Sequence, residues 1–267
     1  MIESNLKQYA ALWLCLLVVL MPRLGRAASA VSGEFEQANK LYEQGKFREA
    51  VAAYQQLIDR GVQSPAIYFN LGNGWYKAGQ NGRAVAAYLQ AERLAPRDPS
   101  IRFNLDFIRR RISVTGAAVP FWQRWLRRLS VNEWAIAAAA AVWIWMLLLA
   151  AREFRRSWQS MLRGYTLWSG VLGAILILAL AAAVYDRNET KTAVVVVPEA
   201  TVRYGPLEES QTFYKLPDGS EIRILDEKIN SKEDAWVQIE DANGRPGWVK
   251  RDQVLPVFGE PSKTKPA

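Results

Sequence analysis

Side chains able to catalyse reactions are scarce in this chain. It has no histidine and one cysteine, Cys15, so imidazole bases, Ser-His or Cys-His nucleophile pairs and ordinary zinc sites lack their groups. Adjacent carboxylates occur at Glu208-Glu209 and Glu233-Asp234, but both pairs lie in polar, turn-like stretches that are typical of solvated surface. We therefore predict a non-enzymatic protein with no cofactor and no metal site.

A repeated pattern indicates recognition rather than catalysis. The chain resembles itself at a spacing of 34 residues, which aligns Gly45 with Gly79 and Tyr54 with Tyr88. FREAVAAYQQ aligns with GRAVAAYLQ, and Phe69 begins an FNL triplet that recurs 34 residues later. A period of this length is typical of stacked helix pairs.

The residue types within the period resemble the tetratricopeptide repeat, W-x-x-L-G-x-x-Y followed by A-x-x-x-F and a proline. The residues that carry the resemblance are Tyr68, Leu71, Gly72, Trp75, Ala84, Tyr88 and Pro96. The match is strong over residues 65–98 and weaker over 31–64, and one further helix, 99–112, completes the array. The resemblance implies two antiparallel helices per repeat, with small residues at the helix crossing and most aromatics in the core.

The same resemblance implies that the first helix of each repeat lines a concave groove that binds a peptide or a neighbouring protein. The residues expected in this groove are Phe35, Asn39, Tyr42, Phe69, Asn70, Asn73, Tyr76, Phe103 and Asn104. Asparagine offers both donors and an acceptor, which suits a partner's backbone or carboxylate. The alternative is that these asparagines are consensus solvent-facing residues.

The first 30 residues predict an export signal. Lys7 precedes the apolar run 10–21, and Ala28-Ser29-Ala30 fits the A-x-A site that signal peptidase accepts. Cleavage there would leave Val31 as the first mature residue. An uncleaved anchor is the alternative, although the run is short for a membrane span.

Two later segments are long enough to cross a membrane. Residues 134–151 and 165–185 form uncharged runs of 18 and 21 residues. Ser130 and Glu133 form an S-x-x-E capping box that predicts a helix start before the first run. The alternative is a buried hairpin of a soluble protein.

Arginine placement predicts the topology. Residues 100–165 carry eleven arginines against three acidic residues, and the positive-inside rule puts the short loop 152–164 in the cytoplasm. The arginines of 109–111 and 124–128 would also prefer the cytoplasm, but the export signal outweighs them. We interpret 113–133, with FWQRWLRRL at 121–129, as an amphipathic linker on anionic lipid headgroups. The soluble ends carry no basic stripe, so nucleic acid is not an expected partner.

The C-terminal segment predicts an all-β domain over residues 192–257, followed by a disordered tail, 258–267. Short β-rich runs alternate with turn signals and predict five or six strands in a small closed barrel. The pieces VRYGP at 202–206, Trp236-Val237 and GRPGWV at 244–249 resemble the bacterial SH3-like (SH3b) domain. The candidate binding residues are Tyr204, Trp236 and Trp248, although both tryptophans also suit the core.

The order of signal, repeats, two spans and an SH3-like domain resembles the BatE-type proteins of the Bacteroides aerotolerance (Bat) group. We therefore expect a multidomain fold, with an all-α repeat domain, a transmembrane helical hairpin and an all-β SH3-like barrel. The resemblance implies a non-enzymatic scaffold in the bacterial inner membrane with both soluble parts in the periplasm. Its implied partners are von Willebrand A-domain Bat proteins and, indirectly, a MoxR-type ATPase. The alternative is a cell-wall tether whose SH3-like domain binds peptidoglycan.

Overall fold

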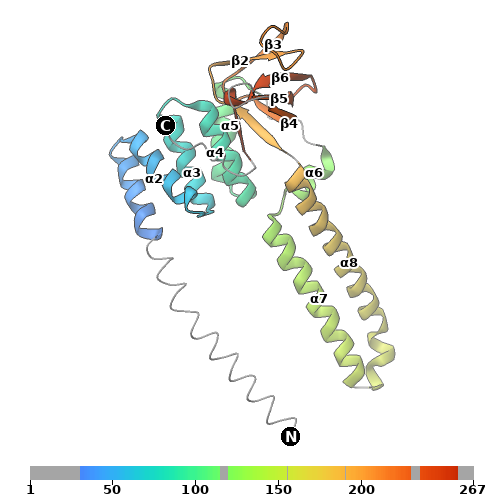
Figure 1. Ribbon diagram of the computed structural model, residues 1–267. Helices are drawn as coiled ribbons and strands as arrows, with labels where there is room; N and C mark the ends of the chain where they lie inside the picture. Colours follow the sequence, from blue (N-terminus) through green and yellow to red (C-terminus); the bar gives the residue numbers. More distant parts are fainter. Residues whose placement is uncertain (1–30, 115–119, 155, 190, 230–234, 258–267) are drawn as a thin grey trace.

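The chain folds into a helical array, a long two-helix hairpin and a β-sheet. The computed structural model describes residues 31–114, 120–154, 156–189, 191–229 and 235–257. The expected signal segment, the C-terminal tail and the Glu233-Asp234 pair lie outside the described residues. Figure 1 shows the sheet seated against the helical array, close to the point where the hairpin begins.

The helical array alternates direction at turns that the sequence specifies. Residues 31–43 are helical, and four helices follow: α2 (Phe47–Asp59), α3 (Pro65–Lys77), α4 (Asn81–Leu94) and α5 (Pro99–Arg111). Gly45 and Gly79 have φ values of 75° and 79°, a left-handed conformation that glycine adopts without steric cost. Pro65 and Pro99 occupy the first turn of α3 and α5, where a missing N–H costs nothing.

Small residues let the paired helices approach closely, as the sequence predicted. A Cβ added at Gly72 in α3 would lie 2.6 Å from the Tyr88 ring of α4. Ala84 and Ala91 are fully buried on α4. Tyr54 and Tyr88 are also buried, which confirms that these aromatics belong to the repeat core.

The hairpin consists of α7 (Val131–Phe154) and α8 (Gln159–Glu189), joined through the short 3₁₀ helix η1 (Arg156–Trp158). By length and composition both helices are able to cross a membrane; the 24 and 31 residues correspond to about 36 and 46 Å. Both helices are longer than the uncharged runs 134–151 and 165–185, because polar residues on either side of each run are also helical. Trp145 of α7 packs over Gly170 of α8.

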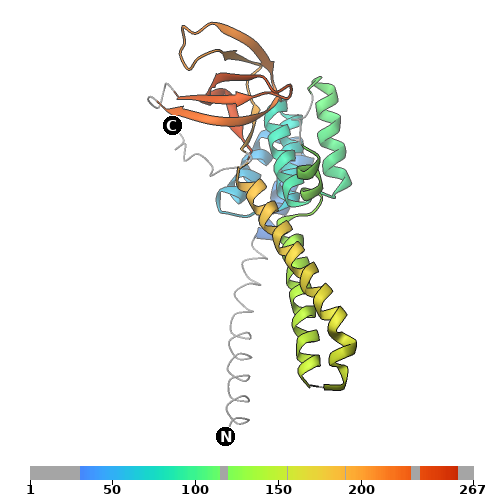
Figure 2. The ribbon, with the colours of Figure 1, turned by 90° about the vertical axis from the view of Figure 1, so that its right-hand side faces the viewer.

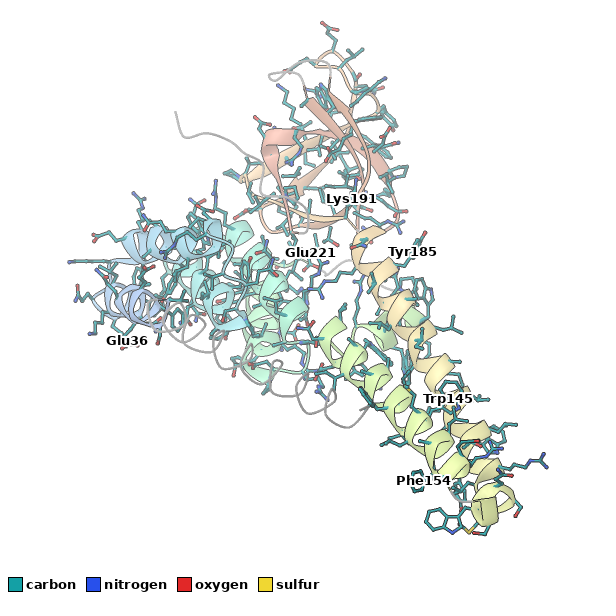
Figure 3. The ribbon with its side chains drawn as sticks, turned by 60° about the horizontal axis from the view of Figure 1, so that its bottom comes forward. Glu36, Trp145, Phe154, Tyr185, Lys191 and Glu221 are labelled. Atoms are coloured by element: carbon teal, nitrogen blue, oxygen red, sulfur yellow. The ribbon has the colours of Figure 1, made fainter. Side chains whose placement is uncertain are left out.

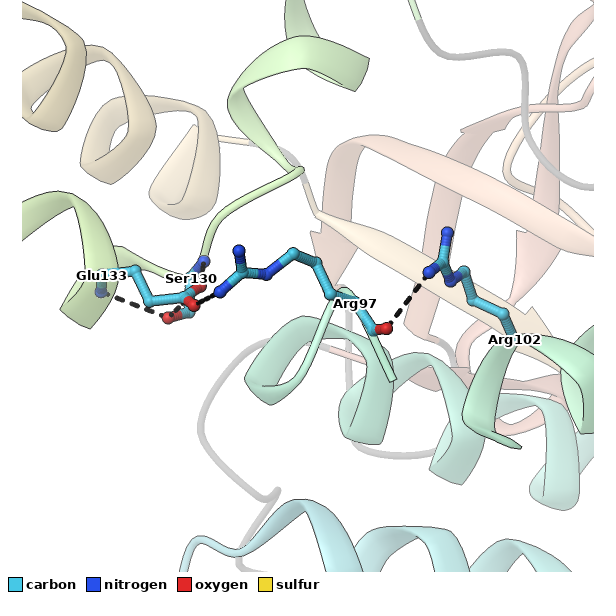
Figure 4. Close-up of polar contacts among 4 residues, drawn as sticks. All are labelled: Arg97, Arg102, Ser130 and Glu133. Atoms are coloured by element: carbon cyan, nitrogen blue, oxygen red, sulfur yellow. Dashed lines mark hydrogen bonds and ion pairs between the residues drawn. The ribbon is translucent and has the colours of Figure 1, made fainter. Parts of the chain in front are cut away.

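The start of α7 has the predicted capping box. The Ser130 backbone N–H donates to Glu133 Oε2 (2.8 Å), and the Glu133 N–H donates to Ser130 Oγ (3.3 Å). Arg97, in the turn before α5, forms an ion pair with the same Glu133, and Arg102 Nη2 donates to the Arg97 carbonyl oxygen (3.1 Å; Figure 4). The hairpin is thus attached to the helical array at its first turn.

The strands form one antiparallel sheet, in the order β3-β2-β6-β5-β4-β1-β7. Its strands are β1 (Thr192–Val195), β2 (Glu199–Arg203), β3 (Thr212–Pro217), β4 (Glu221–Ile229), β5 (Ala235–Glu240), β6 (Pro246–Lys250) and β7 (Val254–Pro256). A second 3₁₀ helix, η2 (Arg251–Gln253), separates β6 from β7.

The closed barrel predicted from the sequence is not confirmed, because this sheet is open. Within the described residues, β3 pairs only with β2 and the three-residue β7 pairs only with β1. Neither edge strand therefore hydrogen-bonds to the other, as closure requires. The sheet has seven strands rather than the five or six expected.

Both ends of the hairpin lie on the side of the globular parts. α7 leads away from the helical array and α8 returns to the sheet (Figure 2). The short helix α6 (Phe121–Leu126) precedes α7 in the chain, and its Phe121, Trp122 and Trp125 side chains are exposed. The Trp134 indole N–H donates to the Leu126 carbonyl oxygen (3.0 Å), which holds α6 against the base of α7.

Candidate functional site

The predicted groove contains a hydrogen-bonded relay centred on Asn39. Asn39 Oδ1 accepts from the hydroxyl of Tyr54 on α2 (2.7 Å) and from Nδ2 of Asn70 on α3 (2.9 Å). These three residues come from three successive helices. The relay therefore links the first repeat to the second.

The second repeat contains the same relay 34 residues further on. Asn73 Oδ1 accepts from the Tyr88 hydroxyl (2.7 Å) and from Nδ2 of Asn104 on α5 (3.1 Å). The two relays are equivalent and recur at the repeat period, so the oxygen of each asparagine accepts two hydrogen bonds. Each one is held in a single orientation by its neighbours.

The relays determine which part of each amide is available to a ligand. Both hydrogen bonds end on the oxygen of Asn39 or Asn73, so its NH₂ group must point the other way. Within the described part of the chain, neither Nδ2 of Asn39 nor Nδ2 of Asn73 donates a hydrogen bond. The groove thus presents two preoriented amide donors.

A cavity of about 350 Å³ opens at the first relay. Its lining residues are Glu36, Asn39, Tyr42, Glu43, Tyr54, Asn70 and Asn73. Four of them were predicted from the sequence, and the two glutamates and Tyr54 were not. Glu36 precedes Asn39 by three residues and Glu43 follows it by four, so the helical period itself signals a shared face.

The protonated Tyr54 hydroxyl and the carboxylates of Glu36 and Glu43 determine which ligands suit this cavity. Burial raises the pKa of Tyr54 to about 12, so its hydroxyl stays protonated and continues to donate to Asn39 at neutral pH. Glu36 and Glu43 are exposed at the rim, and Figure 3 shows Glu36 on the helical array far from the hairpin. Two carboxylates at the entrance favour a ligand with a basic group and disfavour a free carboxylate.

The remaining predicted groove residues have packing roles. Phe35 contacts Tyr54 and Phe69 contacts Tyr88, with ring centroids 6.0 and 5.9 Å apart. Tyr76 packs edge-on against Phe107 (5.9 Å). The structure does not place these three aromatics around the cavity, whereas Phe103 is exposed.

The three candidates on the sheet have different environments. Trp236 is only 1% exposed, so it cannot touch a ligand, and Trp248 is half-buried opposite Arg203. Tyr204 is 60% exposed and stacks on Phe213 (4.3 Å, 29°). Phe213 was not selected from the sequence, because a stacked pair across two strands requires the register.

The sheet contacts the back of the helical array, a surface we call the repeat–sheet interface. The Gly82 N–H on α4 donates to Asp218 Oδ1 (3.1 Å). Arg109 on α5 forms a two-pronged ion pair with Glu221 (2.7 and 3.0 Å; Figure 3 labels Glu221). Gln90 Nε2 donates to the Val257 carbonyl oxygen (2.9 Å). None of these residues lines the cavity at the Asn39 relay, which remains open.

These features define a two-repeat helical array with two oriented asparagine amides and a polar cavity at the first of them. A family model of the tetratricopeptide repeat matches residues 35–99, which span both repeats up to the start of α5. No curated protein was found to match the chain. In the described residues, no group of three or more metal-ligating side chains could hold a metal ion.

Proposed function

We propose that this chain is a membrane-anchored scaffold whose repeat groove binds an extended segment of a partner protein. The observation that carries this proposal is the pair of relays that orient the amides of Asn39 and Asn73. The tetratricopeptide match supports it, because such repeats serve protein–protein interaction. Preoriented donors bind with little loss of side-chain entropy.

The groove chemistry suggests the kind of segment. The two free NH₂ groups suit backbone carbonyl oxygens of an extended chain, and Glu36 and Glu43 suit a lysine or arginine beside them. The partner segment is thus a short, extended and basic peptide. This chemistry differs from recognition of a terminal carboxylate, which requires cations in the groove.

The hairpin supports a membrane location. Its outward side chains are large and apolar, including Trp143, Leu147, Leu172 and Leu178, as expected for helices surrounded by lipid. Since both ends of the hairpin meet the globular parts, a spanning hairpin puts the repeats and the sheet on the same side. From the sequence resemblance we further propose that this membrane is the bacterial inner membrane and that the repeats and the sheet face the periplasm. On the same basis, we propose Bat proteins and a MoxR-type ATPase as partners.

Aspartate variants test the groove without breaking the relays. In Asn39→Asp/Asn73→Asp each side chain keeps an oxygen that accepts from tyrosine and asparagine, but an oxygen that repels backbone carbonyls replaces the NH₂ donor. Alanine would remove both functions at once. We expect recovery of partner proteins from gently solubilised membranes to fall about tenfold, a cost of roughly 1.4 kcal/mol. Affinity purification with quantitative mass spectrometry measures it.

The matched control changes charge equally outside the groove. Gln63→Glu/Gln211→Glu alters two exposed side chains and should leave recovery unchanged. A separate pair, Glu36→Gln/Glu43→Gln, tests whether a basic partner residue is needed. Equal recovery with the aspartate variant and the wild type would show that the groove is not the binding surface.

The exposed Tyr204–Phe213 stack favours a second candidate, a tether in which an SH3-like sheet binds peptidoglycan. Stacked aromatic faces suit the apolar faces of sugar rings. For the tether we expect the full chain in detergent to sediment with purified wall sacculi, and Tyr204→Ala/Phe213→Ala to reduce this severalfold. Leu207→Ala is the control, since Leu207 is exposed without joining the stack. Absence of co-sedimentation would remove the tether.

A further inference from the structure

A second cavity, of about 550 Å³, lies where the helical array, the linker before α7 and the end of α8 meet. Its lining comes from α4, the turn after it, α5, residues 124–131, residues 183–187 at the end of α8, and Thr192 and Glu221 of the sheet. This junction is the end of the hairpin nearest the globular parts, marked in Figure 3 by Tyr185 and Lys191. For a hairpin that spans a bilayer, it is the level of the lipid headgroups.

Positive charge dominates this cavity, which we call the arginine cavity. Seven arginines but only three carboxylates line it. Asp186 and Glu221 are already engaged by Arg127 (2.9 and 3.2 Å) and Arg109. Burial raises the pKa of the third carboxyl, Glu92.

Several guanidinium groups have no acidic partner. Among the described residues, Arg124, Arg128 and Arg187 form no ion pair. Burial and the neighbouring cations Arg187 and Arg127 lower the pKa of Arg93 to about 10. The site therefore holds positive charge that the described residues do not neutralise, and a bound anion would relieve this repulsion.

Apolar residues also line the arginine cavity. Leu126, Leu129, Val131 and Ala183 line it. Beside it, α6 exposes Phe121, Trp122 and Trp125, which are the residue types that settle at a membrane–water interface. A cavity lined by both arginines and apolar residues matches a ligand with an anionic head and a hydrocarbon tail.

We propose that the arginine cavity binds the phosphate group of an anionic membrane lipid. The planar forks of Arg124, Arg128 and Arg187 would donate to the phosphate oxygens, and the acyl chains would continue along α7 and α8. This inference rests on the proposed membrane insertion of the hairpin. A soluble phosphate compound has the same anionic group, so the source must be distinguished by experiment.

The test uses the full chain purified in a non-ionic detergent. Binding of short-chain phosphatidylglycerol, short-chain phosphatidylcholine, glycerol phosphate and inorganic phosphate is measured by isothermal titration calorimetry. We expect saturable binding of phosphatidylglycerol at one site and at least tenfold weaker binding of the zwitterionic lipid. Arg124→Ala/Arg128→Ala should weaken phosphatidylglycerol binding about tenfold or more. Both side chains are exposed and form no ion pair within the described part of the chain, so folding should be unaffected, which thermal unfolding verifies.

Arg110→Ala/Arg111→Ala is the control, because it removes the same charge from exposed positions outside the cavity. Equal affinity for glycerol phosphate and the lipid would assign the site to a soluble phosphate. Absence of saturable binding, or equal loss in both double variants, would overturn the site. Alkaline extraction of membranes tests insertion separately, since a spanning hairpin stays in the pellet whether or not the cavity binds lipid.

Discussion

Replacing Gly82 with alanine is expected to separate the sheet from the helical repeats while both parts remain folded. A Cβ at this position would overlap the Val195 carbonyl oxygen of β1 and Asp218 Oδ1. The Asp218 side chain is able to rotate, but Val195 contributes backbone within a paired strand and cannot yield cheaply. Overpacking of this kind costs roughly 2 kcal/mol, which corresponds to about thirtyfold more frequent opening.

Hydrogen exchange of the full chain in detergent would measure this opening. Amides of α4 near Gly82 and of the turn at 218–220 should exchange faster, while those in the core of α2 remain protected. Gly33→Ala is the control, because a Cβ there meets nothing within 4 Å and alanine favours a helix. Unchanged exchange in Gly82→Ala would mean that the repeat–sheet interface does not hold the two parts together.

Much of the helical array could be predicted from the sequence because its determinants are local. The 34-residue period sets the helix pairs, the turn glycines mark their ends, and Gly72 must be small to fit under Tyr88. The relays at Asn39 and Asn73 were predicted as positions but not as hydrogen bonds. Their partners Tyr54 and Tyr88 lie 15 residues away, on a helix whose rotation the period alone does not define.

Features that depend on contacts between distant residues could not be predicted from the sequence. Whether the sheet closes depends on which strands form its edges, and the three-residue β7 is too short to show an alternating pattern. The pairing of Arg109 with Glu221 joins residues 112 positions apart, and no spacing rule connects them. The arginine cavity was also missed, because arginines assigned to a lipid-facing linker converge with Arg93 and Arg187 only in the folded chain.

The repeat–sheet interface has a consequence for the scaffold. Its residues on α4 and α5 do not line the cavity at Asn39, so a partner segment could enter the groove while the sheet stays docked. In the proposed membrane-anchored scaffold, the sheet, the groove and the hairpin would then form one unit at the membrane surface. Tethering partners at such a surface raises their local concentration, so moderate groove affinity suffices.

Removal of Arg109 is expected to destabilise this unit more than removal of any exposed arginine. In Arg109→Ala the Glu221 side chain, only 4% exposed, loses the guanidinium that binds both its oxygens. Although burial opposes it, the bond to Glu221 raises the pKa of Arg109, so this guanidinium is charged at neutral pH. Leaving a buried carboxylate without this partner costs about 3 kcal/mol, to be measured by denaturant unfolding of the full chain in detergent.

The same experiment separates the ion pair from general effects of charge. Arg110→Ala, on the same helix, removes an exposed arginine that donates to a backbone carbonyl oxygen (3.2 Å), and it should cost less than about 0.5 kcal/mol. The double variant Arg109→Met/Glu221→Leu should recover most of the lost stability, since apolar residues often replace a buried pair without cost. If Arg109→Ala and Arg110→Ala unfold alike, the ion pair does not stabilise the interface, and the docking of the sheet must depend on the contacts around Gly82.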